Sequence, residues 1–134
     1  MKKRILSLAL SAAMALTMLP TGAFAAGDKG KPPVYNKATG CYEISTPDQL
    51  LYLSGSWKDG TPRDGHYVLT ADIDMTGVKG FKPIASKKEQ GFIGTFDGQF
   101  HAIKGLRVEY EKKYAGLFGY VGNQDDQAYI KDVA

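Results

Sequence analysis

An all-β fold of the parallel β-solenoid type is the fold class that this sequence predicts. Ten residues from His66 to Met75 alternate between apolar and polar side chains, which is the pattern of a strand with one buried face. Short apolar segments then recur between glycines. Ile103-Lys104-Gly105-Leu106 also resembles Ile130-Lys131-Asp132-Val133 further along the chain, and an offset of this size is typical of stacked units. A small β-sandwich with a coincidental internal match is the alternative.

Residues 1–25 have the features of a secretory signal peptide. Lys2, Lys3 and Arg4 precede an apolar run, and Ala23-Phe24-Ala25 offers the small residues at which signal peptidase cleaves. The run from Ile5 to Leu19 is shorter than the roughly 20 residues that span a bilayer, so a retained membrane anchor is the weaker alternative. We therefore expect a secreted or cell wall-associated protein that begins near Ala26.

The composition after residue 25 excludes some classes of function. The precursor has 17 basic and 14 acidic residues, and three of the basic ones lie in the signal peptide, so the rest is formally neutral. No basic stripe is present to neutralise phosphates, which argues against nucleic-acid binding. The single cysteine, Cys41, cannot form an internal disulfide; we interpret it as a small half-buried side chain, with a reactive thiol as the alternative.

The segment from residue 26 to residue 41 is predicted to be a linker or extended lead-in. Ala26 to Pro33 is polar and rich in glycine and proline, as flexible linkers are. Val34 to Ile44 contains the turn signal Ala38-Thr39-Gly40, which favours a short hairpin or an extended strand.

One short helix is predicted over residues 47–54. Thr46 is a good N-cap, Pro47 suits the first helical position, and Gln49 completes a capping box. Gly55 is a natural stop. A helix of about two turns is not stable alone, so its apolar face should cover the open end of the first coil of the solenoid. That face consists of Leu50, Leu51 and Leu53.

The remaining segments are predicted to be strands. In the longest, Tyr67, Leu69, Ala71, Ile73 and Met75 face one side. The others are 81–84, 92–96, 102–110, 115–121 and 129–133.

These segments resemble, in sequence and order, bacterial surface proteins that carry the GLUG motif. The resemblance begins at Tyr42-Glu43-Ile44-Ser45-Thr46-Pro47-Asp48-Gln49-Leu50 and continues through Tyr67–Met75 and Phe92–Gly98. Gly116-Leu117-Phe118-Gly119-Tyr120-Val121 matches the motif that names the group. Phe100 departs from the pattern, because relatives have glycine before His101.

The resemblance implies a right-handed parallel β-helix over residues 42–134, on a secreted or cell-wall protein. Such modules act as scaffold or binding regions in adhesins and surface peptidases. Relatives continue with further coils, so we expect the module to be incomplete at its C-terminal end. An incomplete last coil predicts self-association through that edge.

Few residues are candidates for chemistry. Asp72 and Asp74 form an Asp-x-Asp pair that could bind Ca²⁺ or act as acid and base, but an alternating strand also places them in solvent. Asp97-Gly98 is foremost a turn dipeptide. His66 and His101 have no ligand partners at metal-binding spacing. We therefore predict no catalytic, cofactor or metal site.

The aromatic side chains are the candidates for binding. Flat amphipathic rings stack on sugars or fill protein interfaces, although core packing is the commoner role. The candidates are Trp57, Tyr110, Tyr114, Tyr120 and Tyr129.

The predicted function is a structural or binding module of the cell surface, adhesin-like and not an enzyme. Its partner would be a cell-wall or host glycan or a protein, with no nucleic acid and, after signal cleavage, no membrane. The alternatives are an N-terminal accessory piece of a larger surface peptidase and a polysaccharide lyase or hydrolase. About three coils spaced near 4.8 Å give a short face, which argues against a lyase groove.

Overall fold

The computed structural model describes residues 30–55, 57, 61–112 and 114–134. The predicted signal peptide lies outside these residues. None of the helices in the described ranges combines the length and apolar character that a membrane span requires.

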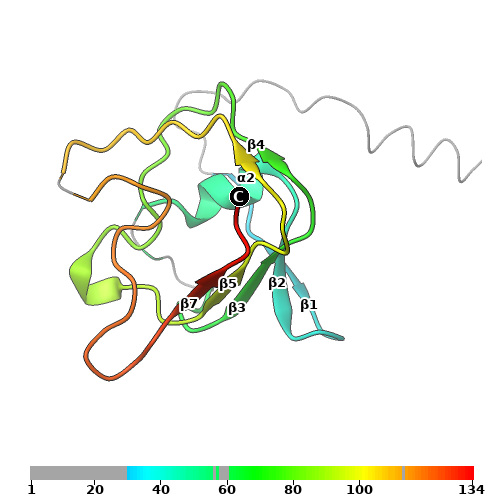
Figure 1. The fold of residues 1–134 in the computed structure, drawn as a ribbon, viewed down its shortest axis with the longest axis vertical. Helices are drawn as coiled ribbons and strands as arrows, with labels where there is room; N and C mark the ends of the chain where they lie inside the picture. The colour runs from blue at the N-terminus through cyan, green and yellow to red at the C-terminus, as the bar shows by residue number, and fades with distance from the viewer. Residues whose placement is uncertain (1–29, 56, 58–60, 113) are drawn as a thin grey trace, which may run out of the picture.

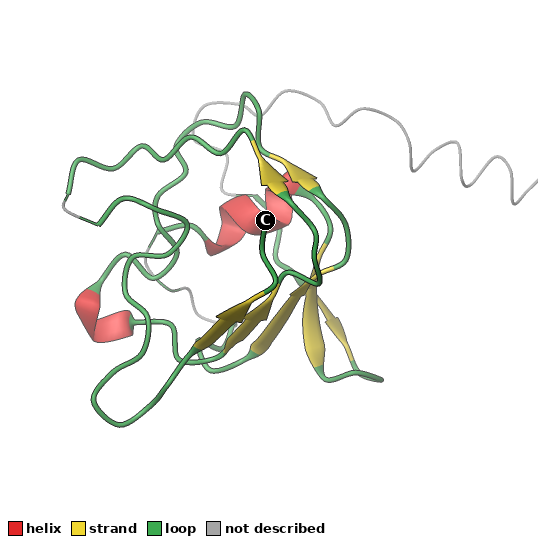
Figure 2. Cartoon of the chain, viewed as in Figure 1, coloured by secondary structure: helices red, strands yellow, loops and turns green. Residues whose placement is uncertain are grey.

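The described part of the chain is mainly β (Figures 1 and 2). A five-stranded sheet has the order β1-β2-β3-β5-β7, and β4 pairs with β6 in a second, small sheet. A 3-10 turn, η1, covers Lys88–Gln90. The other elements are β1 (Val34–Asn36), β2 (Cys41–Ile44), α2 (Pro47–Leu53), β3 (His66–Leu69), β4 (Ile73–Asp74), β5 (Thr95–Asp97), β6 (Ile103–Lys104) and β7 (Tyr129–Lys131).

Four strands of the large sheet are parallel and in register. Tyr42 pairs with Tyr67, Tyr67 with Phe96, and Phe96 with Ile130. Ile73 of β4 pairs in parallel with Ile103 of β6, in the other sheet. Each turn of the chain thus adds a strand directly beside the strand of the previous turn, and Figure 1 shows β2, β3, β5 and β7 side by side.

The sheet begins with a hairpin, which is one of the two alternatives expected for Val34–Ile44. β1 and β2 are antiparallel, and the Asn36 carbonyl accepts a 2.8 Å hydrogen bond from the Gly40 amide. Gly40 has a φ of 71°, a conformation that glycine adopts at little cost. Upstream, the Lys31 amide donates to the Asp48 carbonyl at 3.1 Å, so the lead-in contacts the helix before the first strand begins.

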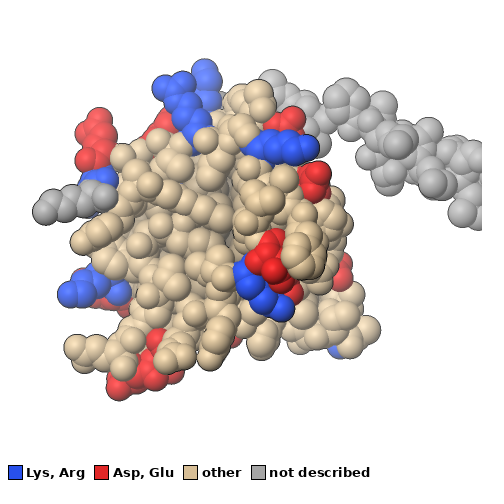
Figure 3. All heavy atoms as spheres, in the orientation of Figure 1, with Lys and Arg blue, Asp and Glu red and all other residues tan. Residues whose placement is uncertain are grey.

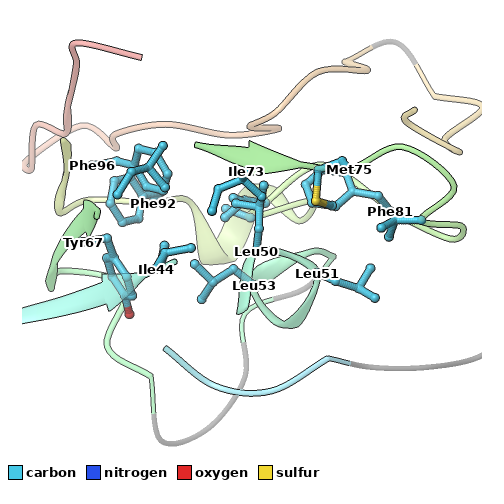
Figure 4. Packing of buried hydrophobic residues seen from close by; sticks show 14 residues of the cluster. Ile44, Leu50, Leu51, Leu53, Tyr67, Ile73, Met75, Phe81, Phe92 and Phe96 are labelled. Carbon is cyan, nitrogen blue, oxygen red and sulfur yellow. The ribbon is translucent and has the colours of Figure 1, made fainter. Parts of the chain in front are cut away.

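Helix α2 forms where the capping box predicts it. The Gln49 amide donates to the Thr46 hydroxyl, and the Gln49 side chain accepts from the Ser45 and Thr46 amides at 2.7 and 3.2 Å. The helix ends at Leu53, one residue earlier than predicted, with Ser54 as C-cap. Its leucines Leu50, Leu51 and Leu53 join the core (Figure 4).

Several strand predictions were wrong in detail. Residues 81–84 and 115–121 form only isolated bridges, and residues 102–110 form a strand only at Ile103–Lys104. The alternating segment His66–Met75 is two strands, because the chain bends at Ala71 and passes from the large sheet into the small one. The alternation survives the bend, since Tyr67, Leu69, Ile73 and Met75 are all buried. A period-two pattern records which side chains are inside, and it does not record a corner between sheets.

The internal match between residues 103–106 and 130–133 was also misinterpreted. Ile103 belongs to the small sheet and pairs with Ile73, whereas Ile130 belongs to the large sheet and pairs with Phe96. The two segments therefore are not equivalent positions in successive turns, and the offset between them is not the spacing between paired strands.

The core lies between the two sheets and α2. In the part of the chain that the structure describes, its buried apolar side chains all fall between Ile44 and Phe96. They are Ile44, Leu50, Leu51, Leu53, Tyr67, Leu69, Ile73, Met75, Val78, Phe81, Ile84, Ala85, Phe92 and Phe96.

Candidate functional site

The corner between the two sheets gathers polar groups from successive turns of the chain. Asp72 Oδ1 lies 3.2 Å from His101 Nδ1 and accepts a 3.0 Å hydrogen bond from the Ala102 amide. Lys104 Nζ lies 3.7 Å from Asp72 Oδ2. The bond from the Ala102 amide, followed by that from His101, holds the pKa of Asp72 below its usual range. Asp72 is thus an ionised carboxylate that joins one turn to the next.

The other two candidate carboxylates also bind backbone amides. Asp74 Oδ1 accepts from the Thr76 amide at 3.0 Å, and Asp97 Oδ1 accepts from the Gln99 amide at 2.9 Å. The hydrogen bonds from Thr76 lower the pKa of Asp74, and the Gln99 amide, then Lys131, lower that of Asp97. Low pKa values suit permanent acceptors and do not suit a general acid near neutral pH.

The paired aspartates, Asp72 and Asp74, are both exposed, as an alternating strand places them. Each is engaged by a different segment, Asp72 by residues 101–104 and Asp74 by Thr76. Among the described residues, no group of three or more His, Cys, Asp or Glu side chains has an arrangement that could hold a metal ion.

The two histidines lie in different places. His66 is exposed at the start of β3, opposite Thr95. His101 follows β5, where its ring contacts Asp72 and its amide donates to the Gly98 carbonyl at 2.8 Å.

The aromatic candidates divide into packed and exposed rings. Trp57 lies against the core, 6.0 Å from the Tyr67 ring and 5.7 Å from the Phe92 ring, and its Nε1 donates to the Thr61 carbonyl. Tyr110 is half-buried, and its hydroxyl donates to the Ser86 carbonyl at 3.3 Å.

The exposed rings lie in the last part of the chain. Tyr114 is 57% exposed, and its ring meets Tyr120 edge-on at 5.6 Å. Tyr129, in β7, is 61% exposed. Val121 and Ile130 are also exposed, which leaves an apolar surface there. Figure 3 views the molecule from the side of the C-terminus and shows a broad surface free of acidic and basic residues, with most charged side chains at its rim.

Phe100 was not among the candidates predicted from the sequence, but its side chain is the most exposed large apolar one among the described residues. It is 83% exposed, and it has a φ of 62° next to Gln99 at 48°. Two successive non-glycine residues in the left-handed region are strained. The turn is held by the Phe100 amide, which donates to the Asp132 carbonyl at 2.9 Å. The sequence feature that could have drawn attention to this residue was the phenylalanine before His101, where the resemblance leads one to expect glycine.

Comparison with known proteins gives one partial similarity. No family model matches the chain, and no solved structure matches it. Halomucin from Haloquadratum walsbyi is 38% identical over 100 residues, which cover 63% of this chain and 1% of Halomucin. The chain thus spans a very small part of that relative, and the resemblance to GLUG-motif proteins stays a prediction.

Proposed function

We propose that this chain is an exported cell-surface module that acts as a scaffold or binding region and not as an enzyme. In this proposal its strands are the start of a right-handed parallel β-helix, and α2 caps the first coil. The observation that carries the proposal is the parallel ladder of Tyr42, Tyr67, Phe96 and Ile130, because each turn of the chain adds one in-register strand.

The polar groups of the corner support a structural role. Asp72, Asp74 and Asp97 each accept from a backbone amide, and each has a lowered pKa. A lyase or hydrolase needs a proton donor or base whose pKa lies near the working pH. The carboxylates therefore suit the joining of successive turns better than they suit catalysis.

The surface location rests on two further observations. Residues 1–25 carry the pattern of a signal peptide. The similarity to Halomucin, whose name refers to mucin, fits a protein that works outside the cell.

Export is tested with a reporter that is active only outside the cytoplasm, fused after Ala134. The full chain should give an active reporter, and the matched control that lacks residues 2–25 should give none. Equal activity from both fusions would refute the proposed location.

Binding is tested by sedimentation of the secreted chain with purified cell walls. The chain should sediment with the walls and release no soluble sugar from them. The variants Asp72→Ala and Asp74→Ala should bind as the parent does. Release of sugar that disappears in Asp72→Ala would support a lyase or hydrolase instead.

A further inference from the structure

The corner turn that contains Phe100 is longer than the turns stacked directly before and after it. Each corner turn lies between two rows of residues that stand opposite each other in successive turns of the chain. The first row is Val68, Asp97 and Lys131, and the second is Asp72, Ala102 and Ala134. Three residues lie between the rows at 69–71, four at 98–101 and two at 132–133. The turn at 98–101 therefore projects outward past both of its neighbours.

The exposure of Phe100 does not depend on any further coil. Its amide donates to the Asp132 carbonyl at 2.9 Å, so the following turn is already in place beside it. The Ala102 amide donates to Asp72 at 3.0 Å, so the preceding turn is in place as well. With a neighbour on each side, the Phe100 side chain is still 83% exposed. Its exposure is a property of this corner.

Hydrogen bonds hold the projecting turn in one conformation. Asp97 Oδ1 accepts from the Gln99 amide at 2.9 Å, and the His101 amide donates to the Gly98 carbonyl at 2.8 Å. Gln99 and Phe100 have φ values of 48° and 62°, which the bonded turn imposes on both. A side chain on such a fixed turn loses little conformational entropy when a ligand binds to it.

The charged groups that flank the turn are paired with one another. On one side, Asp97 Oδ2 lies 3.1 Å from Lys131 Nζ. On the other side, Asp72 contacts His101 at 3.2 Å and lies 3.7 Å from Lys104 Nζ. Because each flank combines a carboxylate with a lysine, the corner has no excess charge that would attract an anion or a cation. The surroundings suit a neutral, polar ligand.

The phenyl ring of Phe100 is alone at this corner. The other exposed large apolar residues lie outside the three corner turns, and they are Val34, Tyr35, Tyr114, Val121, Tyr129 and Ile130. A stable protein interface takes about 800 Å² from each partner around an apolar centre, and one aromatic ring supplies only about 200 Å². A single sugar ring matches a single phenyl ring in size, with its C–H face on the ring and its hydroxyls toward polar groups.

We propose that the turn at 98–101 is a binding site for a neutral sugar. The sugar stacks on the phenyl ring of Phe100, and a hydroxyl hydrogen-bonds to the side-chain amide of Gln99, which is exposed on the same turn and both donates and accepts. This inference rests on the proposed binding to cell walls and names the part of the molecule that makes the contact.

Titration of the secreted chain with short oligosaccharides is the first test. The neutral probes are cellotetraose and N-acetylchitotetraose, and tetragalacturonate is the charged control. We expect a neutral probe to shift the amide NMR signals of residues 98–101, with a dissociation constant on the order of 1 mM. No response to either neutral probe, or tighter binding of tetragalacturonate, would overturn the proposal.

Substitutions of Phe100 separate binding from stability. Phe100→Gly should weaken binding of the neutral probe about tenfold, because the stacking surface is removed. The same variant should melt at the parent's temperature or higher, since glycine adopts a φ of 62° at little cost. Phe100→Trp should bind at least as well as the parent, and Tyr114→Ala, the matched loss of another exposed ring, should bind equally well. Undiminished binding by Phe100→Gly would refute the site.

Sedimentation with cell walls distinguishes the site from the proposed function. Equal sedimentation of the parent and of Phe100→Gly would refute the site and leave wall binding established. A parent that does not sediment would refute wall binding, and the oligosaccharide titration would still decide the site. Binding that depends on Phe100 but is lost when the walls are first treated with protease would identify a protein ligand, and the sugar proposal would be overturned.

Discussion

Tyr67 and Ile130 hold the same register position in two strands of one sheet, and their environments are opposite. Tyr67, in β3, is fully buried between β2 and β5, and its hydroxyl donates to the Pro62 carbonyl at 2.7 Å. Burial raises the pKa of Tyr67 far above its ordinary value. Ile130, in β7, is 41% exposed.

The same contrast extends to the two halves of the chain. Among the described residues, the buried apolar side chains of the core all lie at or before Phe96, whereas Ile103, Leu106, Leu117 and Phe118 only pack partly against them. Both halves have apolar residues at inward positions, so composition does not make the difference. In a ladder of strands, an inward side chain becomes buried only when it has neighbours on both sides.

The largest expected effect comes from placing charges in the covered half. Leu50→Asp with Leu53→Asp should unfold the chain, because two unpaired carboxylates under the ladder cost more than a marginally stable domain of about 5–15 kcal/mol can offset. Circular dichroism and amide NMR dispersion measure the loss. The matched control, Val121→Asp with Ile130→Asp, should stay folded. A Leu50→Asp/Leu53→Asp variant that stays folded would contradict the proposed capping role of α2.

Replacing the side chains of Phe96 and Ile130, which are paired in register, with alanine measures the difference in burial between β5 and β7. Phe96→Ala should lower the free energy of unfolding by about 3–5 kcal/mol, since it opens a cavity in a packed core. Ile130→Ala should cost less than about 1 kcal/mol, because its side chain is already half in water. Urea denaturation at low protein concentration gives both values, and equal losses would show that β7 is as well covered as β5.

Two glycines test how closely the turns approach each other. A Cβ at Gly94 would meet the Gly65 carbonyl, and a Cβ at Gly98 would meet the Asp132 carbonyl. Each change to alanine should cost about 1–3 kcal/mol through overpacking. Hydrogen exchange should show that Gly98→Ala loosens residues 128–134 alone, and that Gly94→Ala also loosens β3. Loss of protection throughout after Gly98→Ala would mean that the two halves unfold together.

The smallest effect is a pH dependence at the open end. Asp97 Oδ2 lies 3.1 Å from Lys131 Nζ. The hydrogen bond from the Gln99 amide, followed by that from Lys131, lowers the pKa of Asp97. A lowered pKa contributes stability that is present above the unfolded pKa and is lost as pH falls through the folded pKa. Protection of the β7 amides should therefore decrease between about pH 5 and pH 2. Asp97→Asn should remove this dependence and Asp74→Asn should not, as amide NMR can show.

The local parts of the fold could be predicted from sequence, and the long-range parts could not. The capping box of Thr46 and Gln49 lies within a single helical turn, so helix α2 is determined by contacts that neighbouring residues make. The bend at Ala71 depends on where the next sheet lies, which no local pattern records. The pairing of Ile103 with Ile73 was missed for the same reason.

The candidate site shows the same limit. Asp72 was recognised as a solvent-facing carboxylate, and it is one. Its contact with His101 joins residues that are far apart in the sequence and arises only from the stacking of two turns. The turn at Phe100 is likewise held by the Asp132 carbonyl of the following turn, which accepts from the Phe100 amide.

The pairing of β5 with β7 shows how the chain accommodates length changes. Phe92 pairs with Val121 and Phe96 pairs with Ile130, so the segment 121–130 is matched to the shorter segment 92–96. The additional length lies between Val121 and Ile130, where the Asn123 side chain accepts from the Asp125 and Asp126 amides at 2.8 and 2.6 Å. A self-contained turn thus takes up the extra length without moving the strands. Such turns are the natural places for peptide insertions, through which one scaffold can acquire new surface loops during evolution or in the laboratory.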